Sequence, residues 1–484
     1  MTLSFALNNA VTGLAANSTQ AELIANNVAN ALTEGYGRRE ASLSSISLGG
    51  AGAGVRVDGV TRASSPVATD ARRVAEAAEG ASAVRADVLS RLSEVVGEPG
   101  EPDALATLAD KMDTAFAAAA DTPESAVTLR TAARAAGDYA TAVNRIALEA
   151  ISLRGEMDAS IATQVDTINS SLTKIQSLNT EIKAREISGA DTSALLDQRE
   201  RLIKSVSSML PVRTQQREFG SIAVYTQSGG QLLDGKVFPL EFEPSAAAPS
   251  SETIENGGLS GLASNGVPVR AGEAGLFGGG SLAAAFDARD TVIPDILDGL
   301  DALAASLLQR TEGLPADTSS APGAAGLFTD GGAAFDGTNQ LGLSERLALN
   351  VAVDEDRGGE ATRLRDGLGA TAPGTEGDNR ILRGLQDALT TPSAVSAAIF
   401  SGARGIAGFS TELSAGLLAS SSAATEDAAN QTGRADTLRA AELSEIGVDT
   451  DQELSRLLQV EQAFAANARV IEVVDTLMQR LLQI

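Results

Sequence analysis

Apolar residues recur with heptad spacing at both ends of the chain. Between residues 3 and 33, one heptad position holds Leu7, Leu14, Ala21 and Val28, and its companion holds Leu3, Ala10, Asn17, Ile24 and Ala31. From residue 450 to 484, the corresponding sets are Leu457, Phe464, Ile471 and Met478, and Val460, Asn467, Val474 and Leu481. Each pattern predicts a helix of roughly 45 to 50 Å with a narrow apolar seam that needs a partner in water. The two terminal helices are therefore predicted to pack together.

Each seam contains one Asn in an otherwise apolar row. If the chain leaves the helical pair at about Thr33 and returns at about Thr450, the two helices run antiparallel. Asn17 and Asn467 are then almost equally far along the chain from these two points. Both are predicted to lie at one level, where a polar layer fixes the register as a buried Asn does in coiled coils.

The middle of the chain changes its hydrophobic period several times. Helical spacing predicts helices over residues 66–97, 103–120, 124–186, 193–209, 281–311 and about 379–445. A period of two with Ser-Gly-Gly and Asp-Gly turns predicts short strands over 220–242. A short strand and turn are predicted at 54–62, and one strand is predicted at 347–353. Within "LLDQRERL", Arg199 and Glu200 are expected to form surface ion pairs worth under about 1 kcal/mol.

These patterns predict a mainly α protein with a smaller β or mixed insertion. A coiled-coil-like inner assembly domain is expected from residues 1–34 and 450–484. A helical middle domain is expected from residues 35–210, 281–312 and 378–449, and an irregular, β-rich or mixed outer domain from 211–280 and 313–377.

Charge narrows the choice of partners. Asp and Glu number 63 against 37 Lys and Arg, which gives a formal net charge of −26. Such a chain repels phosphate backbones and anionic lipid surfaces, so neither nucleic acid nor a membrane is expected as a partner. Glu22 is the one charged residue among the first 33, so the basic region of a cleavable secretion signal is missing.

The chain contains neither His nor Cys. This excludes a thiol nucleophile, a zinc-thiolate site, a disulfide framework and a Ser-His-Asp triad. Asp354, Glu355 and Asp356 are the remaining catalytic candidates, but a Gly-rich loop is a poor scaffold for an acid-base pair at fixed distance. We therefore expect no catalytic residue, no metal site and no cofactor, with a carboxylate-based hydrolase carried on an appendage as the less favoured alternative.

Two terminal motifs resemble those of a known family. The stretch "NNAVTGLAANSTQAELIANNVANALTEGYGRRE" is similar to the signature of flagellar axial proteins of rod, hook and hook-filament junction, and "ELSRLLQVEQAFAANARVIEVVDTLMQRLLQI" resembles its carboxy-terminal counterpart. Internally, "SALLDQRERLIKSVSSMLPV" and "SLAAAFDARDTVIPDILDGLDALAASL" resemble segments of the hook-associated protein 1 family. These internal stretches favour that family over the hook and distal rod proteins, which remain the alternative.

The resemblance implies a structural, non-enzymatic adaptor of the bacterial flagellum at the hook-filament junction, on which the filament grows. It implies export through the flagellar type III channel without a cleaved signal peptide, and an extracellular location. The implied partners are further copies in a helical tubular array, the hook protein below, and a second junction protein or flagellin above. A cytoplasmic export chaperone is expected at the C-terminal helix.

In such an array, the terminal helices of neighbouring copies are expected to cover each other's seams. Asn side chains are expected to bond across copies, since each unsatisfied one costs roughly 1 to 3 kcal/mol. Gly35 is expected to turn the chain out of the tube with a positive φ, and Tyr36 to anchor that exit. The predicted assembly residues are Leu7, Leu14, Asn17, Ile24, Asn26, Asn27, Asn30, Gly35, Tyr36, Leu457, Phe464, Asn467, Ile471, Val474, Met478 and Leu481.

Overall fold

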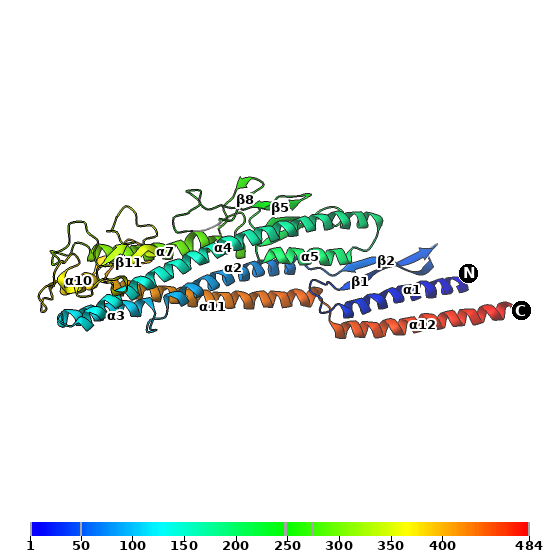
Figure 1. Ribbon diagram of the computed structural model, residues 1–484. Coiled ribbons are helices and arrows are strands. Elements are labelled where there is room, and N and C mark those ends of the chain that lie inside the picture. Colours follow the sequence, from blue (N-terminus) through cyan, green and yellow to red (C-terminus); the bar gives the residue numbers. More distant parts are fainter. Residues whose placement is uncertain (1, 49–50, 246–248, 273–274, 483–484) are drawn as a thin grey trace. The chain divides into compact units, whose positions relative to one another are not determined.

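The computed structural model describes residues 2–48, 51–245, 249–272 and 275–482, and it is mainly helical (Figure 1). The predicted fold class is confirmed. The chain forms two compact units. Unit 1 comprises Met1–Glu79, Asp166–Leu240 and Gln431–Ile484, and unit 2 comprises Gly80–Val165 and Glu241–Asn430. Helices α2 (Pro66–Val96), α4 (Ala126–Ser188) and α11 (Ile406–Ile446) contribute residues to both units, and the predicted division into three domains stays a prediction.

The terminal helices lie side by side in unit 1. Helix α1 (Thr2–Ala29) runs antiparallel to α12 (Thr450–Leu482), so both chain ends lie at the same end of the pair (Figure 1). Helix α12 begins after Asp449, whose Oδ1 accepts hydrogen bonds from the backbone N of Asp451 at 3.0 Å and Gln452 at 3.1 Å. This side-chain cap satisfies donors that have no partner within the helix.

A β-hairpin follows α1 and packs on it. Strands β1 (Arg39–Leu48) and β2 (Ala51–Arg62) pair antiparallel. Asn8 Nδ2 donates to the Ala53 carbonyl at 2.6 Å, and Thr12 Oγ1 accepts from the Val55 N–H at 3.3 Å. Gly54 has φ +120°, and a Cβ there would lie 2.3 Å from Thr12 Oγ1, so only glycine allows this approach. The strand predicted within 54–62 is confirmed in β2, but the turn predicted with it is wrong, because β2 continues to Arg62.

The rest of unit 1 combines helices with a small sheet. Helix α5 (Ser193–Ser207) precedes a four-stranded antiparallel sheet in the order β3-β4-β5-β6. The strands are β3 (Val212–Gln216), β4 (Ile222–Thr226), β5 (Gln231–Asp234) and β6 (Lys236–Val237). Ile168, Leu172 and Ile175 of α4 are fully buried in this part of the chain. The predicted strands of 220–242 are thus confirmed, whereas β3 lies outside the predicted range.

Unit 2 is built around an Ala- and Leu-rich helical core. Helices α3 (Leu105–Asp121), α7 (Ile293–Thr311) and α10 (Arg380–Thr390) pack there with parts of α2, α4 and α11. Phe116, Tyr139 and Phe409 are among its largest fully buried side chains. The predicted helix at 281–311 is confirmed as a continuous run of α6 (Ser281–Asp287), a π-helical turn at Ala288–Val292 and α7.

The prediction of one helical region over 379–445 is wrong in its middle. Helix α10 ends at Thr390, and strands β12 (Ser393–Ala394) and β13 (Ala403–Arg404) precede α11. Pro392 disfavours helical geometry at the residue before it. Gly299 on α7 then makes room for the segment, since a Cβ there would lie 1.9 Å from Ile399 Cδ1.

The remaining elements are short. The predicted strand at 347–353 is confirmed only over β11 (Leu347–Leu349), which pairs with β10 (Phe328–Asp330). The others are β7 (Leu240–Glu241), β8 (Ala263–Ser264), β9 (Val267–Pro268), α8 (Leu343–Arg346), a 3-10 turn at Glu355–Arg357 and α9 (Arg363–Asp366). Among the described residues, no helix has the length and apolar character needed to cross a membrane.

Candidate assembly interface

Asn27 is the most buried of the predicted assembly residues, with 1% of its surface exposed. Its Oδ1 accepts hydrogen bonds from the Tyr36 hydroxyl at 2.8 Å and the Arg39 N–H at 3.0 Å. Its Nδ2 donates to the Arg39 carbonyl and to Glu453 Oε2, both at 3.0 Å. All its polar atoms therefore bond inside the chain and join α1, the exit turn, β1 and α12. The predicted contact of Asn27 with a neighbouring copy stays a prediction.

The exit from α1 depends on Gly35 and Tyr36. Gly35 has φ +77°, as predicted, and a Cβ there would lie 2.7 Å from Arg201 Cγ. The Tyr36 ring lies under the Arg39 guanidinium at 4.9 Å, and burial raises the pKa of its hydroxyl. A buried tyrosine that donates to Asn27 holds the turn in one conformation.

Asp197, from the "LLDQRERL" motif of α5, fastens the same turn from the other side. Its Oδ1 accepts from the Gly37 N–H at 3.2 Å and Arg62 Nε at 2.6 Å, and its Oδ2 accepts from Arg39 Nη2 at 3.0 Å. One buried carboxylate thus bridges the turn and both hairpin strands. We refer to Asn27, Tyr36, Arg39, Asp197 and Glu453 as the exit cluster.

The expectation of surface ion pairs for Arg199 and Glu200 is wrong. Arg199 is buried, and its Nη1 donates to Asn179 Oδ1 at 2.9 Å and to the Gly220 carbonyl at 2.7 Å. Glu200 accepts from Arg72 at 3.0 Å and from Arg73 at 2.8 Å. These partners come from α2, the end of α4 and the loop before β4. The sequence pattern placed the motif on a helix but held no information about which distant residues would meet it.

Arg72 lies at the centre of a second set of buried charges. It forms ion pairs with Glu76 at 2.6 Å, Glu200 at 3.0 Å and Glu442 at 2.5 Å. Burial alone would lower the pKa of Arg72, but the three carboxylates outweigh it and the pKa is raised. This network joins α2, α5 and the last turns of α11.

The single chain covers only part of the predicted seams. Ile24 and Val474 are buried at 6% exposure each. Half-buried are Leu14, Asn17, Asn30, Gly35, Leu457, Asn467 and Ile471. Exposed are Leu7, Asn26, Phe464, Met478 and Leu481. The Asn26 and Asn30 side chains donate to backbone carbonyls one turn earlier in their own segment.

The two seam Asn residues lie close to one level in the helical pair. Asn467 Nδ2 lies 2.6 Å from the position that a Cβ on Gly13 would take. Gly13 precedes Asn17 by four residues, which is about one helical turn. Both Asn residues therefore lie within about two helical turns of each other, and the polar layer that they were expected to form stays a prediction. No sequence pattern pointed to Gly13, because a glycine within a helix indicates close packing against another helix only when the residue opposite it is known.

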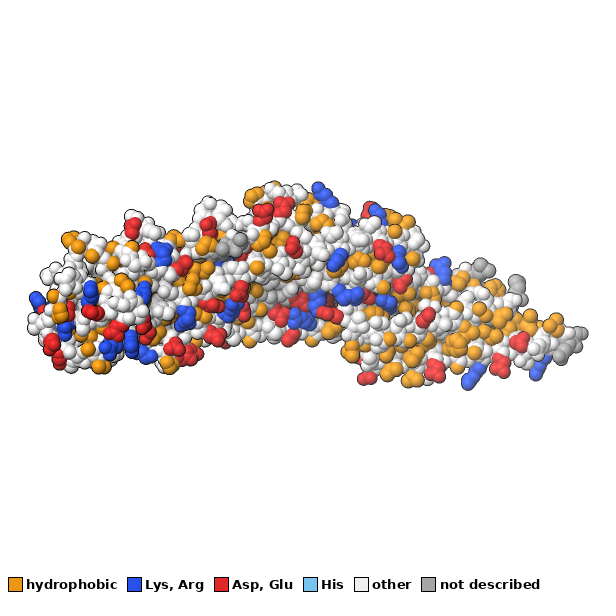
Figure 2. Space-filling view, in the orientation of Figure 1, with side chains coloured by type: hydrophobic (Ala, Val, Ile, Leu, Met, Phe, Trp, Pro, Cys, Tyr) orange, Lys and Arg blue, Asp and Glu red, His pale blue; other side chains and the backbone are white. Residues whose placement is uncertain are grey.

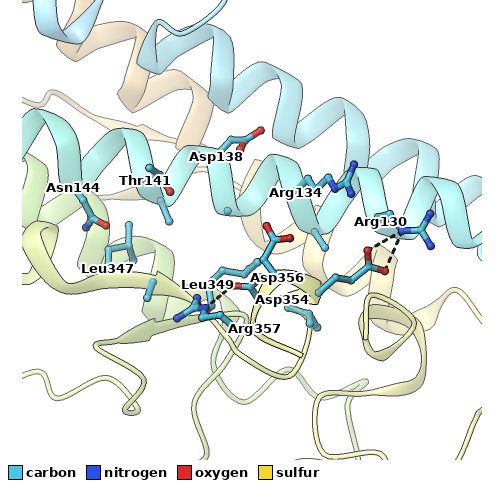
Figure 3. Close-up of a pocket in the computed structure, with 16 residues that line it drawn as sticks. Arg130, Arg134, Asp138, Thr141, Asn144, Leu347, Leu349, Asp354, Asp356 and Arg357 are labelled. Atoms are coloured by element: carbon cyan, nitrogen blue, oxygen red, sulfur yellow. Dashed lines mark hydrogen bonds and ion pairs between the residues drawn. The ribbon is translucent and has the colours of Figure 1, made fainter. Parts of the chain in front are cut away.

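The alternative catalytic residues line a groove of about 350 Å³ in unit 2 (Figure 3). Glu355 accepts from Arg130 Nε at 2.8 Å, and Asp354 is paired with Arg357. Burial would raise the pKa of Asp354, but the hydrogen bond and charge of Arg357 outweigh it, so the pKa is lowered. A general acid needs the opposite shift, and the ion-paired carboxylate of Asp354 does not supply it.

Comparisons with known proteins place this chain among flagellar proteins. Residues 89–326 match the model of the flagellar hook-associated protein FlgK helical domain. Residues 441–484 match the model of the flagellar basal body rod FlgEFG protein C-terminal segment. The two matches together define a component of the flagellum. The chain belongs to the flagellar hook-associated protein 1 (FlgK) family.

Similar proteins carry the same family name. The chain is 26% identical over 263 residues to "Flagellar hook-associated protein 1" of Escherichia coli (strain K12), covering 52% of this chain and 47% of the relative. It is 26% identical over 267 residues to that of Bacillus subtilis (strain 168), covering 50% and 52%. The chain thus matches about half the length of these curated relatives. A solved structure of the flagellar hook junction protein FlgK from Burkholderia pseudomallei aligns with a TM-score of 0.45 and 20% identity, covering 54% of this chain and 46% of that one.

Proposed function

We propose that this protein is a structural adaptor of the bacterial flagellum that assembles at the hook-filament junction and allows the filament to grow on the hook. Family membership supports the proposal. The observation that carries it is the antiparallel α1–α12 pair, whose outer faces keep large apolar side chains exposed. In Figure 2, hydrophobic side chains gather over these two helices, at the right of the view. Exposed apolar surface of this kind marks a protein-protein contact.

The proposed partners follow from that position. Copies of the chain form a helical tubular array, with the hook protein below and a second junction protein or flagellin above. The protein is exported without a cleaved signal and works outside the cell, and an export chaperone binds the C-terminal helix before export. The match of residues 89–326 to the FlgK helical domain favours this function over that of a hook or distal rod protein. The paired carboxylates of the unit 2 groove give no support to a hydrolase.

Flagella from cells that lack the gene test the proposal. Electron microscopy is expected to show complete hooks without filaments, and filament protein is expected in the medium. Expression of the full chain in these cells is expected to restore filaments. Normal filaments in the deletion strain would contradict the proposed function, and hooks of abnormal length or absent hooks would favour the hook or rod alternative.

A further inference from the structure

A groove of about 450 Å³ lies between α1, β1 and α12 in unit 1. Asn17, Gln20 and Ile24 of α1 form one wall. Arg39 of β1 and Val460 and Ala463 of α12 line the rest. The groove therefore combines apolar walls with two side chains that carry strong hydrogen-bond donors.

Both donors lack an acceptor. Asn17 Nδ2 and Arg39 Nε are buried and have no hydrogen-bond partner among the described residues. Arg39 Nη2 donates to Asp197, and the backbone of Arg39 bonds to Asn27. Leaving a buried donor unpaired is unfavourable, so this groove is suited to a surface that brings oxygen acceptors.

The groove's own carboxylates are already engaged. Arg456 Nη1 contacts Glu453 Oε1 at 3.0 Å and Glu40 Oε1 at 3.3 Å. Glu453 Oε2 accepts from Asn27. In the described chain neither carboxylate accepts from Asn17 Nδ2 or Arg39 Nε, so these two donors stay open to an acceptor from a second molecule.

One face of α12 offers apolar contacts and an acceptor together. Leu454 and Leu458 are exposed at 50% and 60%, and Glu461 is exposed with no hydrogen bond or ion pair to any described residue. These residues have i, i+4, i+7 spacing, which places them on one helix face. We refer to Leu454, Leu458 and Glu461 as the outer face of α12.

Building on the proposed function, we infer that the groove of one copy receives the outer face of α12 of the next copy. The Glu461 carboxylate brings the acceptor oxygens that the groove's unpaired donors lack, and the two leucines lie against the apolar walls. Groove and outer face are different surfaces of the same chain. The contact is therefore head-to-tail and repeats into an open helical array instead of closing into a two-fold dimer.

Disulfide trapping tests the contact directly, because the chain contains no Cys. Gln20→Cys in an untagged full chain and Leu458→Cys in a tagged one are produced together in cells lacking the native gene, and the isolated flagella are oxidised. We expect a mixed dimer of tagged and untagged chains. Leu477→Cys, at an exposed apolar position elsewhere on α12, is the matched control and is expected to give none.

Filaments that form without the mixed dimer, or a dimer from either single variant alone, would overturn the inference and leave the proposed function standing. Filaments in cells without any copy of the gene would overturn the proposed function itself. Preferential trapping with Leu477→Cys would move the contact to another face and reject the one inferred here.

The hydrogen bonds have their own test. Asn17→Ala and Glu461→Ala are each expected to lower the fraction of hooks bearing filaments several-fold, while Glu461→Gln, which keeps an acceptor oxygen, retains most of it. Asn9→Ala, on an exposed position of the same helix, is expected to have no effect. Unchanged filament counts in both Asn17→Ala and Glu461→Ala would overturn the pairing.

Discussion

Ile24 and Asn27 lie one turn apart on α1, yet they belong to two different kinds of surface. From Ile24 toward the amino terminus, the pair with α12 leaves large side chains such as Leu7 and Val11 exposed. At Asn27, every polar atom of the side chain has a partner within the chain. The helical pair is thus unfinished in a single copy, whereas the hydrogen bonds of the Asn27 side chain are complete. We expect substitutions in the α1–α12 pair to impair assembly, and substitutions in the exit cluster to lower the stability of the single chain.

A charge in the seam should give the largest effect. Leu14→Asp or Ile471→Asp places a carboxylate where assembly removes water, at a cost of several kcal/mol per contact if it stays unpaired. Soluble protein should persist, while filaments should be lost in motility assays and electron micrographs. Val67→Asp, at an exposed position of α2, serves as the control. Normal filaments with either seam variant would show that the terminal helices are not the assembly element.

Removing the carboxylate of Asp197 should destabilise unit 1 strongly. Asp197→Ala leaves Arg39 and Arg62 without their shared partner, and breaking a buried pair costs about 3 to 5 kcal/mol. Urea denaturation should show this loss. Asp234→Ala, which removes a solvent-accessible pair with Arg217 and a hydrogen bond from Tyr225, should destabilise the protein far less. Equal effects of the two variants would remove the distinction between the exit cluster and an ordinary surface pair.

Asn27→Ala should have an intermediate effect. It deprives Tyr36 and Glu453 of a hydrogen bond each, and a loss of about 1 to 3 kcal/mol is expected. Amide hydrogen exchange of the unassembled protein should accelerate around residues 30–39 and 450–456. Asn30→Ala, which loses two exposed bonds within its own segment, to the Asn26 carbonyl and from the Thr33 hydroxyl, is the matched control. Unchanged exchange in Asn27→Ala would mean that the exit cluster is held by its other members.

The smallest effect is expected at Asp113, whose carboxylate, unlike that of Asp197, has an oxygen atom without a hydrogen-bond partner among the described residues. Burial, with a contribution from Asp110, raises the pKa of Asp113 on α3 to about 6. Because the folded state holds this proton more tightly than the unfolded state, stability should fall as pH rises from about 4 to 6. We expect a loss of at most about 1 to 2 kcal/mol, after allowing for solvent screening. Asp113→Asn should flatten this part of the pH profile, and an identical profile would contradict the assignment.

The sequence predicted the elements that depend on local pattern. Helices α2 and α4 fall within two residues of their predicted limits, because the 3.6-residue period and the flanking Pro and Gly residues act over a few turns. Strand β1 was missed because "REASLSSISL" carries few large apolar residues, and its pairing with β2 and contact with α1 are long-range. The segment between α10 and α11 was missed for a similar reason, since it packs on Gly299.

The residues of the candidate interface also separate into those that a local sequence pattern identifies and those that only long-range contacts identify. Heptad spacing predicted Ile24 and Val474 in the seams, where the structure buries them, and the glycine after the first helix predicted the turn at Gly35, whose positive φ the structure confirms. The sequence by itself thus determined that both ends are helical, that each carries an apolar seam, and that the chain turns sharply at Gly35. The spacing of apolar residues and the conformational freedom of a glycine both act on residues that are close together in the sequence.

Only the tertiary structure decided which distant residues meet. Asp197 lies more than 130 residues from both Arg39 and Arg62, and Asn27 lies 426 from Glu453. No local pattern encodes such pairs, because a buried carboxylate is stable with any well-placed guanidinium and its sequence neighbours look like those of a surface charge. The same holds for Asn17 and Arg39, whose unpaired donors share one groove only after α1, β1 and α12 have packed.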